Sequence, residues 1–528
     1  MVDVLVVGAG PTGLALALQA KTFGAEVRVV ERRPALFRPS RAMLMHPRTL
    51  EVLTPLGVVD ELLDRGERSP SATVQLGRTA LRVDLADFDL PDTPFPHLLM
   101  IRQAVVEEVL AEALRRTGVE VERGVELLGT WARSSGQAAQ LGSATEGGRM
   151  TADAAYVVGC DGTASIVREL AGIGFHGGAY AEEIVLADLE LDGALTPDRL
   201  NVAVARSGVL FCFAGGENAT WRLLATRAAR EQRGGFGQPR EPVPDDEIQN
   251  LLDGAGLLAR VRSVAWSARV PLQHRVAVRY RQGRLLVAGD AAHSHSPAAA
   301  QGMNAGIQDA TNLGWKLAFA SRAADDVADL LLDSYEQERR RVAQRVLALT
   351  HLVFWGEAGS GLLPATLRGM VAPIAAPVVP AVLGQRRLVA EVVRVVSGLR
   401  WSYRHSALNH DASPGSRGPR PGDRMPDGWV LRGGERVRLH SLLARPGLHV
   451  LLQSDATAPA PADGACGPWL QMHRLDVPGS GMLVVRPDGF VGYRSAGSRT
   501  RTSPNAELVQ WLRLFPGSAP LDTRDIRL

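Results

Sequence analysis

Cysteine is scarce in this chain. Cys160, Cys212 and Cys466 are the only three in 528 residues, and they form neither a CxxC pair nor a spacing typical of zinc ligands. This excludes a disulfide framework and indicates buried or incidental thiols in a reducing compartment. We therefore expect no structural metal.

A strong charge of either sign is also missing. Arg and Lys together number 59 against 56 acidic residues, which gives a net charge of +3, and Lys21 and Lys316 are the only lysines. So small a charge on so long a chain gives no electrostatic basis for binding nucleic acid. We expect no nucleic-acid partner.

Long apolar runs are absent as well. The most apolar stretch, residues 362–383, is interrupted by Arg368 and by prolines that include Pro373, Pro377 and Pro380, which argues against a membrane-spanning helix. No basic segment precedes the apolar residues at the N-terminus, so we read no signal peptide. We therefore expect no membrane partner and a cytoplasmic location. The length suits about three domains of about 100–200 residues.

What the chain does have is a glycine-rich loop at its N-terminus. Gly8, Gly10 and Gly13 follow an apolar run of strand type and precede a helical stretch. Such a loop lets a pyrophosphate approach the backbone and the helix N-terminus. A second strand then ends at Glu31, where a carboxylate can accept hydrogen bonds from a ribose. This order predicts a dinucleotide site.

Two further segments narrow the cofactor to a flavin. A strand-like run leads to Asp161-Gly162, and another leads to Gly289-Asp290, where an acid would point into the ligand crevice of an α/β sheet. Pro297 and Gly302-Met303-Asn304 then open a helix whose N–H groups suit the electron-rich edge of a flavin.

Two histidines in the third segment invite a metal hypothesis. His293 and His295 are two residues apart on a loop, without a nearby acidic or cysteine ligand, so metal binding is disfavoured. We expect one histidine to pack under the flavin and the other to be solvated.

Together these segments resemble the class A FAD-dependent aromatic monooxygenases, the family that includes p-hydroxybenzoate hydroxylase and phenol hydroxylase. The three signatures match in order and spacing, and the resemblance covers positions 1 to about 400. Other matching stretches are Glu31-Arg32-Arg33, Ser40-Arg41, Pro47-Arg48-Thr49-Leu50-Glu51, and Gln103 with Glu107.

The resemblance implies FAD as cofactor and NADPH or NADH as a transient co-substrate. It also implies that a flavin C4a-hydroperoxide, formed with O2, transfers oxygen to a phenolic or polycyclic aromatic substrate. The residues that it assigns to FAD are Gly8, Gly10, Thr12, Gly13, Glu31, Arg32, Arg41, Gln103, Leu127, Asp161, Asp290, Pro297, Gly302, Met303 and Asn304.

A closer likeness is to the hydroxylases that tailor aromatic polyketides. It rests on residues 395–399 followed by Tyr403, and on the segment 482–489 near the C-terminus. In that group the last part of the chain is a thioredoxin-like domain. Here that part contains only Cys466, so we expect no redox dithiol and a structural or assembly role.

Substrate and catalytic residues are less well defined. Phe211, Phe213 and Trp221 lie in strand-like runs that would cover the substrate, although aromatic residues in strands are more often core. His46 and Arg48 are the catalytic candidates, and Arg48 could equally be a salt-bridge partner. No residue is expected to be an essential nucleophile.

Several alternatives remain open at this stage. Baeyer–Villiger insertion of oxygen into a polyketide ketone and hydroxylating inactivation of an aromatic antibiotic both fit the same fold. A flavin-binding partner without turnover is an alternative from a different class. A homodimer is plausible, although no exposed pattern shows one.

For the architecture we expect an α/β protein. A Rossmann-like FAD-binding domain would be interleaved with a β-sheet substrate domain, followed by a helical segment and a C-terminal thioredoxin-like domain. The expected division is residues 1–176 and 276–400 for the FAD-binding domain with the helical segment, 177–275 for the substrate domain, and 401–528 for the C-terminal domain.

Overall fold

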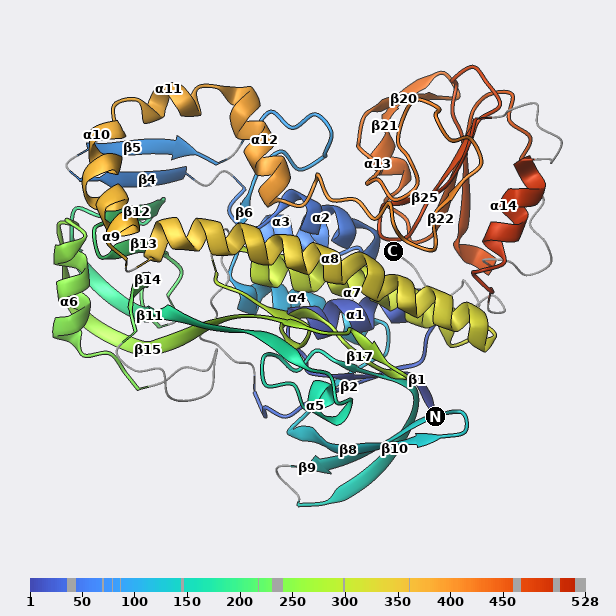
Figure 1. The fold of residues 1–528 in the computed structure, drawn as a ribbon, viewed down its shortest axis with the longest axis horizontal. Coiled ribbons are helices and arrows are strands. Elements are labelled where there is room, and N and C mark those ends of the chain that lie inside the picture. Colours follow the sequence, from blue (N-terminus) through green and yellow to red (C-terminus); the bar gives the residue numbers. More distant parts are fainter. Residues whose placement is uncertain are drawn as a thin grey trace.

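Figure 1 shows the computed structural model, in which three larger sheets are joined by a long central helix. The helices that cover the parallel sheet occupy the centre of the view with that sheet below them, a second sheet lies to their left, and the C-terminal part forms a separate lobe at the upper right. The structure describes residues 1–35, 44–68, 71–77, 79–85, 87–143, 147–216, 218–229, 241–297, 300–359, 361–458, 467–496 and 504–517.

The first sheet is mainly parallel, as the glycine loop requires. Strand β1 (Val2–Val7) lies between β10 (Arg149–Gly159) and β2 (Val27–Glu31) and runs parallel to both. Its last four residues are buried because helices cover the sheet, which explains the continuous apolar run. The order is β16-β17-β10-β1-β2-β7, in which β16 is Arg281–Gln282, β17 is Leu285–Val287 and β7 is Val121–Arg123. Strand β9 (Gly136–Ser143) also pairs with β10, and β8 (Val125–Arg133) pairs with β9.

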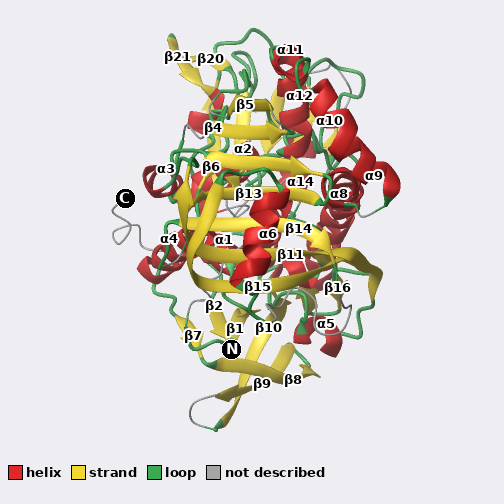
Figure 2. Cartoon of the chain, turned by 90° about the vertical axis from the view of Figure 1, so that its left-hand side faces the viewer, coloured by secondary structure: helices red, strands yellow, loops and turns green. Residues whose placement is uncertain are grey.

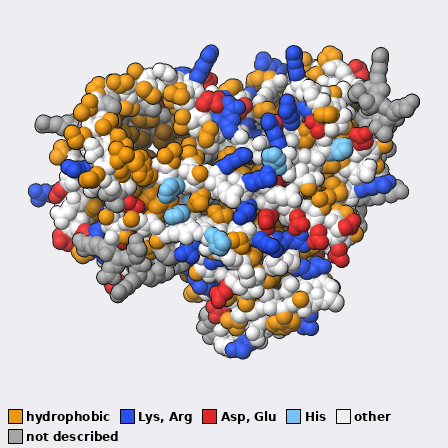
Figure 3. All heavy atoms as spheres, viewed as in Figure 1, with side chains coloured by type: hydrophobic (Ala, Val, Ile, Leu, Met, Phe, Trp, Pro, Cys, Tyr) orange, Lys and Arg blue, Asp and Glu red, His pale blue; other side chains and the backbone are white. Residues whose placement is uncertain are grey.

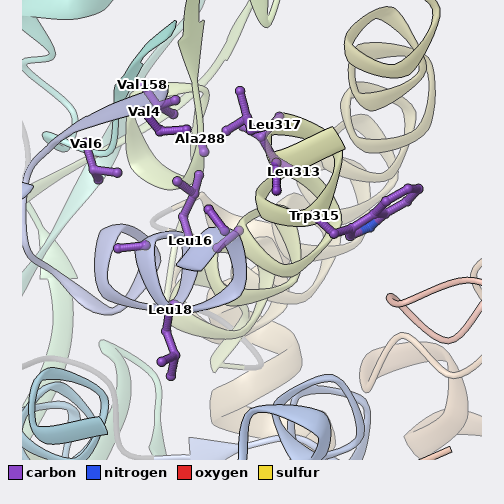
Figure 4. Packing of buried hydrophobic residues seen from close by; sticks show 14 of the residues in the cluster. Val4, Val6, Leu16, Leu18, Val158, Ala288, Leu313, Trp315 and Leu317 are labelled. Carbon is purple, nitrogen blue, oxygen red and sulfur yellow. The ribbon is translucent and has the colours of Figure 1, made fainter. Parts of the chain in front are cut away.

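Helices α1 (Pro11–Thr22) and α7 (Gln301–Ala320) pack on one another and on this sheet. Figure 4 shows their leucines meeting the valines of β1 and β10 in one core. The two helices belong to segments almost 300 residues apart, so the core joins the first and third sequence signatures. Residues labelled in that core include Val4, Leu16, Val158, Leu313 and Leu317.

The second sheet has eight strands in the order β18-β15-β11-β14-β13-β12-β4-β5. Strands β11 (Phe175–Gly193) and β15 (Ala259–Ala277) form its long antiparallel centre, which Figure 2 shows crossing the molecule beside α6 (Asp245–Gly254). One face packs on α6, and the other faces the parallel sheet across a cavity. The other strands are β4 (Ser71–Leu76), β5 (Thr79–Asp84), β12 (Leu200–Ala205), β13 (Gly208–Ala214), β14 (Trp221–Ala228) and β18 (His293–Ser294).

This sheet draws on more of the chain than residues 177–275. Strand β4 pairs in parallel with β12, and β18 pairs with the end of β15. Segments on either side of the expected substrate domain therefore complete its sheet. The division into four parts stays a proposal, and in it the second sheet also includes β4, β5 and β18 from outside residues 177–275.

A helix of 34 residues, α8 (Asp325–Ala358), crosses the whole molecule in Figure 1. Short helices follow it and carry exposed apolar side chains, seen as an orange area in the upper left of Figure 3. No single helix in the described ranges could cross a membrane by length and apolarity, although α8 and the segment Leu362–Val371 meet that criterion together as a pair bent by 60°. The short helices are α9 (Leu362–Thr366), a π-helical turn (Leu367–Val371), α10 (Ala372–Ala375), α11 (Val379–Leu383) and α12 (Arg386–Val396).

The C-terminal lobe has the thioredoxin-like arrangement. Strand β22 (Leu448–Leu452) pairs in parallel with β23 (Leu470–Arg474) and antiparallel with β24 (Met482–Val485). Cys466 lies outside the described residues, so its surroundings stay a prediction. The lobe also contains β25 (Val491–Ser495), β19 (His410–Asp411), the hairpin β20 (Trp429–Arg432) and β21 (Glu435–Arg438), α13 (Leu439–Leu442) and α14 (Pro504–Leu512).

Buried ion pairs attach this lobe to the rest of the molecule. Glu51 binds Arg424 with oxygen–nitrogen distances of 2.5 and 2.8 Å, and both side chains are almost fully buried. Arg486 of the lobe donates to Glu338 of α8, which also accepts from Lys316 of α7. Buried charges are tolerated only when they are paired, so these contacts fix the position of the lobe. Remaining elements are β3 (Leu44–Met45), α2 (Pro47–Leu53), α3 (Val59–Arg65), β6 (Leu99–Met100), α4 (Gln103–Arg116), α5 (Ile166–Leu170), and 3₁₀ turns at Thr54–Leu56, Gly289–Ala291 and Gly467–Trp469.

Candidate cofactor and substrate site

A cavity of about 840 Å³ lies between the parallel sheet and the second sheet. All three sequence signatures reach it, and its two ends differ in chemistry. We call the end with most of the charged side chains the polar end and the other the apolar end. The polar end is lined by residues 7–12, 31–33, 160–164, Gln103, Glu107, Arg123 and residues 125–128, and the apolar end by Ile184, Leu186, Leu200, Phe211, Leu224, Thr226, residues 270–273, Phe354, Glu357 and Val396.

The glycine loop forms the floor of the polar end. A Cβ atom on Gly10 would meet no atom within 4 Å, so this position is open. Gly10 is also the N-cap of α1, and no side chain caps the helix. The first N–H groups of α1 are therefore free to meet an anion, as a pyrophosphate requires.

Gly13 lies behind the loop and does not line the cavity. A Cβ atom there would lie 1.9 Å from the carbonyl oxygen of Gly8. The position is glycine because α1 approaches β1 this closely, and contact with a phosphate is not needed to explain it.

Glu31 holds the loop through its carboxylate. It accepts hydrogen bonds from the backbone N–H groups of Ala9 and Arg33, both at 2.9 Å. Arg32 lines the same end of the cavity. The acid at the end of β2 thus lies where a ribose-binding carboxylate was predicted, and it also stabilises the loop.

Gln103 and Glu107 lie together on the first turns of α4. The Gln103 side chain donates to Glu107 at 2.8 Å. Burial raises the pKa of Glu107 to about 7, because the hydrogen bond from Gln103 only partly offsets the loss of solvation. Leu127 lines the cavity beside them. Arg41, which the resemblance also assigns to FAD, lies outside the described residues.

Asp161 supports the second signature. Its carboxylate accepts N–H hydrogen bonds from Ile166 at 2.8 Å and Val167 at 3.3 Å, at the start of α5. Burial raises the pKa of Asp161, and the bonds from Ser165 and the backbone oppose that shift. This aspartate lines the cavity and fixes the turn that follows β10.

The third signature places Asp290, Pro297, Gly302 and Met303 along the cavity. Helix α7 begins just after Ala300, which has a φ of +52°, and no side chain caps it. Its first N–H groups are therefore available to a polar ligand edge.

The Asn304 side chain supports the cavity wall from behind. It accepts from the N–H of His46 at 2.9 Å and donates to the carbonyls of Leu44 and Ala300. It is fully buried and does not line the cavity, so it holds the 44–46 segment against α7. This contact brings His46 to the cavity wall.

A buried charge cluster fixes the third signature from behind. Asp309 accepts from Arg339 at 2.6 Å and from the N–H of Gly289 at 3.0 Å, and it contacts His293 at 2.7 Å. Burial would raise the pKa of Asp309, but Arg339 and His293 outweigh it and lower the pKa. His293 is therefore a buried partner of Asp309, which corrects the expectation of a solvated histidine. His295 stacks on it and lines the cavity.

Arg48 does not reach this cavity. It donates to Glu51 at 2.8 Å and to the carbonyl of Asp488, and its guanidinium lies over the ring of Phe490 at 4.8 Å. It lines a separate cavity of about 320 Å³ between the FAD-type part and the C-terminal lobe. Its role is contact between these parts, so His46 remains the catalytic candidate.

Of the three aromatic candidates, Phe211 lines the apolar end. Trp221 is on β14 but faces α6, because the cavity-facing residues of that strand are Leu224 and Thr226, at the other parity. Phe213 shares the face of Phe211 but is buried in a small cluster with Ala72 and Leu200.

The residue types fit FAD. An open glycine position, an uncapped helix N-terminus and an acid at the end of the second strand face one end of the cavity. Among the residues that the structure describes, no group of His, Cys, Asp or Glu could hold a metal ion. The fold and site define a flavoprotein with a second compartment for an organic substrate.

Comparison with known proteins shows the family. Residues 1–350 match the FAD binding domain family, and residues 418–514 match the aromatic-ring hydroxylase C-terminal family. The chain belongs to the FAD-dependent aromatic-ring hydroxylases, which are monooxygenases. The class predicted from the three signatures and the C-terminal segment is thereby confirmed.

Relatives cover nearly the whole chain. The 6-methylpretetramide 4-monooxygenase of Streptomyces rimosus is 33% identical over 97% of this chain and 94% of its own. The structure of the anhydrotetracycline hydroxylase OxyS of the same species is 27% identical, with a TM-score of 0.71 over 98% of this chain and 100% of its own. A Diels-Alderase of pyrroindomycin biosynthesis, PyrE3, is 26% identical, with a TM-score of 0.72 over 98% and 100%.

Proposed function

We propose that this protein hydroxylates a phenolic, polycyclic aromatic compound of polyketide type, using FAD, NADPH or NADH, and O2. The observation that carries the proposal is that one cavity has both a dinucleotide-type polar end and an apolar end built by the second sheet. Bound FAD would supply the oxygen-activating chemistry. The relatives that act on tetracycline-type compounds support the substrate class.

The chain's own residues bind and orient in this proposal. The α1 N-terminus and Glu31 would hold the pyrophosphate and ribose, and the start of α7 would face the flavin ring. The apolar walls would exclude water and place a flat aromatic compound against the ring. Since the described chain has one glycine loop of dinucleotide type, the nicotinamide would bind only transiently.

The test starts from the absorption spectrum of the purified protein, followed by NADPH oxidation in air with a panel of naphthacene and angucycline phenols. We expect flavin bands, oxidation that a phenol accelerates, and a product that gains one atom from isotopically labelled O2. A colourless protein that cannot be reconstituted with FAD would contradict the proposal.

The alternatives give different products. Baeyer–Villiger insertion would convert a ketone to an ester or lactone, whereas inactivation would apply to an added aromatic antibiotic. The likeness to a Diels-Alderase favours one further candidate, a flavin-binding protein that rearranges its substrate without consuming NADPH. A product isomeric with the substrate would identify that case.

A homodimer and a cytoplasmic location remain predictions. Sedimentation of the purified protein would test the first of these.

The aromatic residues of the second sheet provide a matched pair of variants. Phe211→Ala should raise KM for the aromatic substrate about 10-fold, since an aromatic contact and its buried area are worth roughly 1–2 kcal/mol. Trp221→Ala should leave KM unchanged and lower the free energy of unfolding by about 3–5 kcal/mol, because it empties a packed core. Steady-state kinetics and denaturant unfolding separate the two. Equal KM effects would contradict the assignment of the cavity face.

A further inference from the structure

Glu357 lies in the last turn of α8 and lines the apolar end of the cavity. Around it the wall is formed by Phe354 on the same helix and by apolar residues of β11, β14 and β15. Among the described residues of the apolar end, Glu357 is the only one with a carboxyl group. An acid among these walls is unexpected for a site that only has to hold an apolar compound.

The carboxylate of Glu357 makes no hydrogen bond or ion pair with any residue that the structure describes. The nearby Arg368 donates instead to the backbone carbonyls of Gly356, at 3.0 Å, and Gly359, at 2.8 Å. Arg368 thus stabilises the helix end without the Glu357 carboxylate, and no described residue occupies that carboxylate.

Burial raises the pKa of Glu357 to about 7, and no charged neighbour opposes this. A carboxyl group with such a pKa is divided between its two protonation states near neutral pH. This is the condition under which a general base is most effective, because it is available as a base and strong enough to take a proton.

Other titratable groups near this end are less suited. Burial, assisted by His293, lowers the pKa of His295 to about 4, which makes it a weak base. Tyr180 of β11, His274 of β15 and His351 of α8 are in ring contact with one another, and Tyr180 also contacts Phe354. None of these three rings lines the cavity.

We propose that Glu357 is the general base that removes the phenolic proton of the substrate. The phenol O–H bond breaks, its electron pair stays on the phenol oxygen, and the proton moves to a carboxylate oxygen of Glu357. The resulting phenolate is richer in electrons at its ortho and para carbons, which prepares them to accept oxygen. This inference rests on the proposed function, because it requires a phenolic substrate in the apolar end.

The first experiment reads ionisation without turnover. FAD-loaded protein is titrated with 1-naphthol in the absence of NADPH, and the longer-wavelength naphtholate band is followed by difference spectroscopy as a function of pH. In the wild type we expect the naphtholate band of bound 1-naphthol to appear at a higher pH than in Glu357→Gln, because the ionised Glu357 carboxylate opposes a second negative charge beside it. In Glu357→Gln the midpoint should fall by at least about one pH unit, and Glu357→Asp should restore part of the difference.

The second experiment compares two phenols in turnover. For Glu357→Gln, kcat/KM with 1-naphthol should fall about 10²–10⁴-fold, the usual contribution of a general base. With 2-chloro-1-naphthol, which is more acidic and leaves the para carbon free to accept oxygen, the loss should be smaller. Asp326→Asn, an exposed acid in the first turn of the same helix, is the matched control and should change neither measurement.

The outcomes separate the two proposals. Equal losses with both naphthols would show that Glu357 only shapes the site. Bound 1-naphthol that ionises at the same pH in the wild type and in Glu357→Gln would also overturn the inference. Either result leaves hydroxylation intact. A wild type that binds neither naphthol, and whose NADPH oxidation is accelerated by no phenol, would contradict the proposed function itself. Retained flavin bands and circular dichroism confirm that each variant is folded.

Discussion

Gly13→Ala is expected to yield a protein that is strongly destabilised and does not retain FAD. The new Cβ atom would lie 1.9 Å from the carbonyl oxygen of Gly8 and 3.3 Å from the Cβ of Cys160. Neither contact can be relieved by rotating a flexible side chain, so α1 must move away from β1. We expect the free energy of unfolding to fall by about 3 kcal/mol or more, the upper range for overpacking.

Gly10→Ala is the matched control in the same loop. Its Cβ atom would meet nothing within 4 Å, and Gly10 has extended backbone angles that alanine adopts. This variant should therefore fold normally, while its methyl group occupies space at the α1 N-terminus. We expect FAD binding to weaken about 10-fold, or roughly 1.4 kcal/mol. Denaturant unfolding measures the free energy of unfolding of each variant, and flavin fluorescence titration measures its affinity for FAD. A Gly13→Ala protein as stable as Gly10→Ala would contradict the close approach.

The cofactor end could be predicted from the sequence because its determinants are local. A glycine loop between strand and helix, and an acid at the end of a strand, are read within a few residues, and the fold then brings the three segments together. Twelve of the predicted cofactor residues line the cavity, whereas Gly13 and Asn304 support it from behind. The sequence does not distinguish contact from support, since both require the same residue types.

The substrate end could not be predicted in the same way, because it depends on tertiary arrangement. Side chains alternate between the two faces along β14, so Leu224 faces the cavity and Trp221 faces α6. The sequence shows this alternation but not which of the two faces α6 covers. Arg48 lies in a segment that reads as flavin-proximal, yet Glu51 and the C-terminal lobe bind it. Glu357 lies in the last turn of a long helix, and nothing in the neighbouring sequence marks it as a site residue. Its position on the cavity follows only from how α8 crosses the molecule.

The largest stability effect outside the site is expected from Glu338→Ala. Glu338 lies on α8 and is fully buried between Lys316 of α7 and Arg486 of the C-terminal lobe, with nitrogen–oxygen distances of 2.7 and 2.6 Å. Burial alone would raise its pKa, but Arg486 and Lys316 outweigh burial and hold the pKa of Glu338 well below 4.5. The group is therefore ionised at neutral pH, and it is the common partner of both cations.

Removing this carboxylate would leave two buried cations without their shared anion. Arg486 keeps Asp488, but Lys316 keeps only the amide oxygen of Asn312 at 2.9 Å. Burial already lowers the pKa of Lys316 to about 8 with Glu338 present, so in the variant Lys316 should lose its proton near neutral pH. Breaking one partner of a buried pair typically costs about 3–5 kcal/mol.

We expect denaturant unfolding of Glu338→Ala to show a free energy of unfolding lower by about 3–5 kcal/mol. We also expect faster proteolysis near residues 401–426, because Arg486 links the lobe to α8. The variant should also gain stability as the pH rises above neutral, since deprotonated Lys316 is less costly to bury. Asp64→Ala is the control. Its pair with Arg68, at 2.6 Å, is exposed to solvent and should contribute less than about 1 kcal/mol. Similar losses in the two variants would mean that the buried network does not hold the lobe in place.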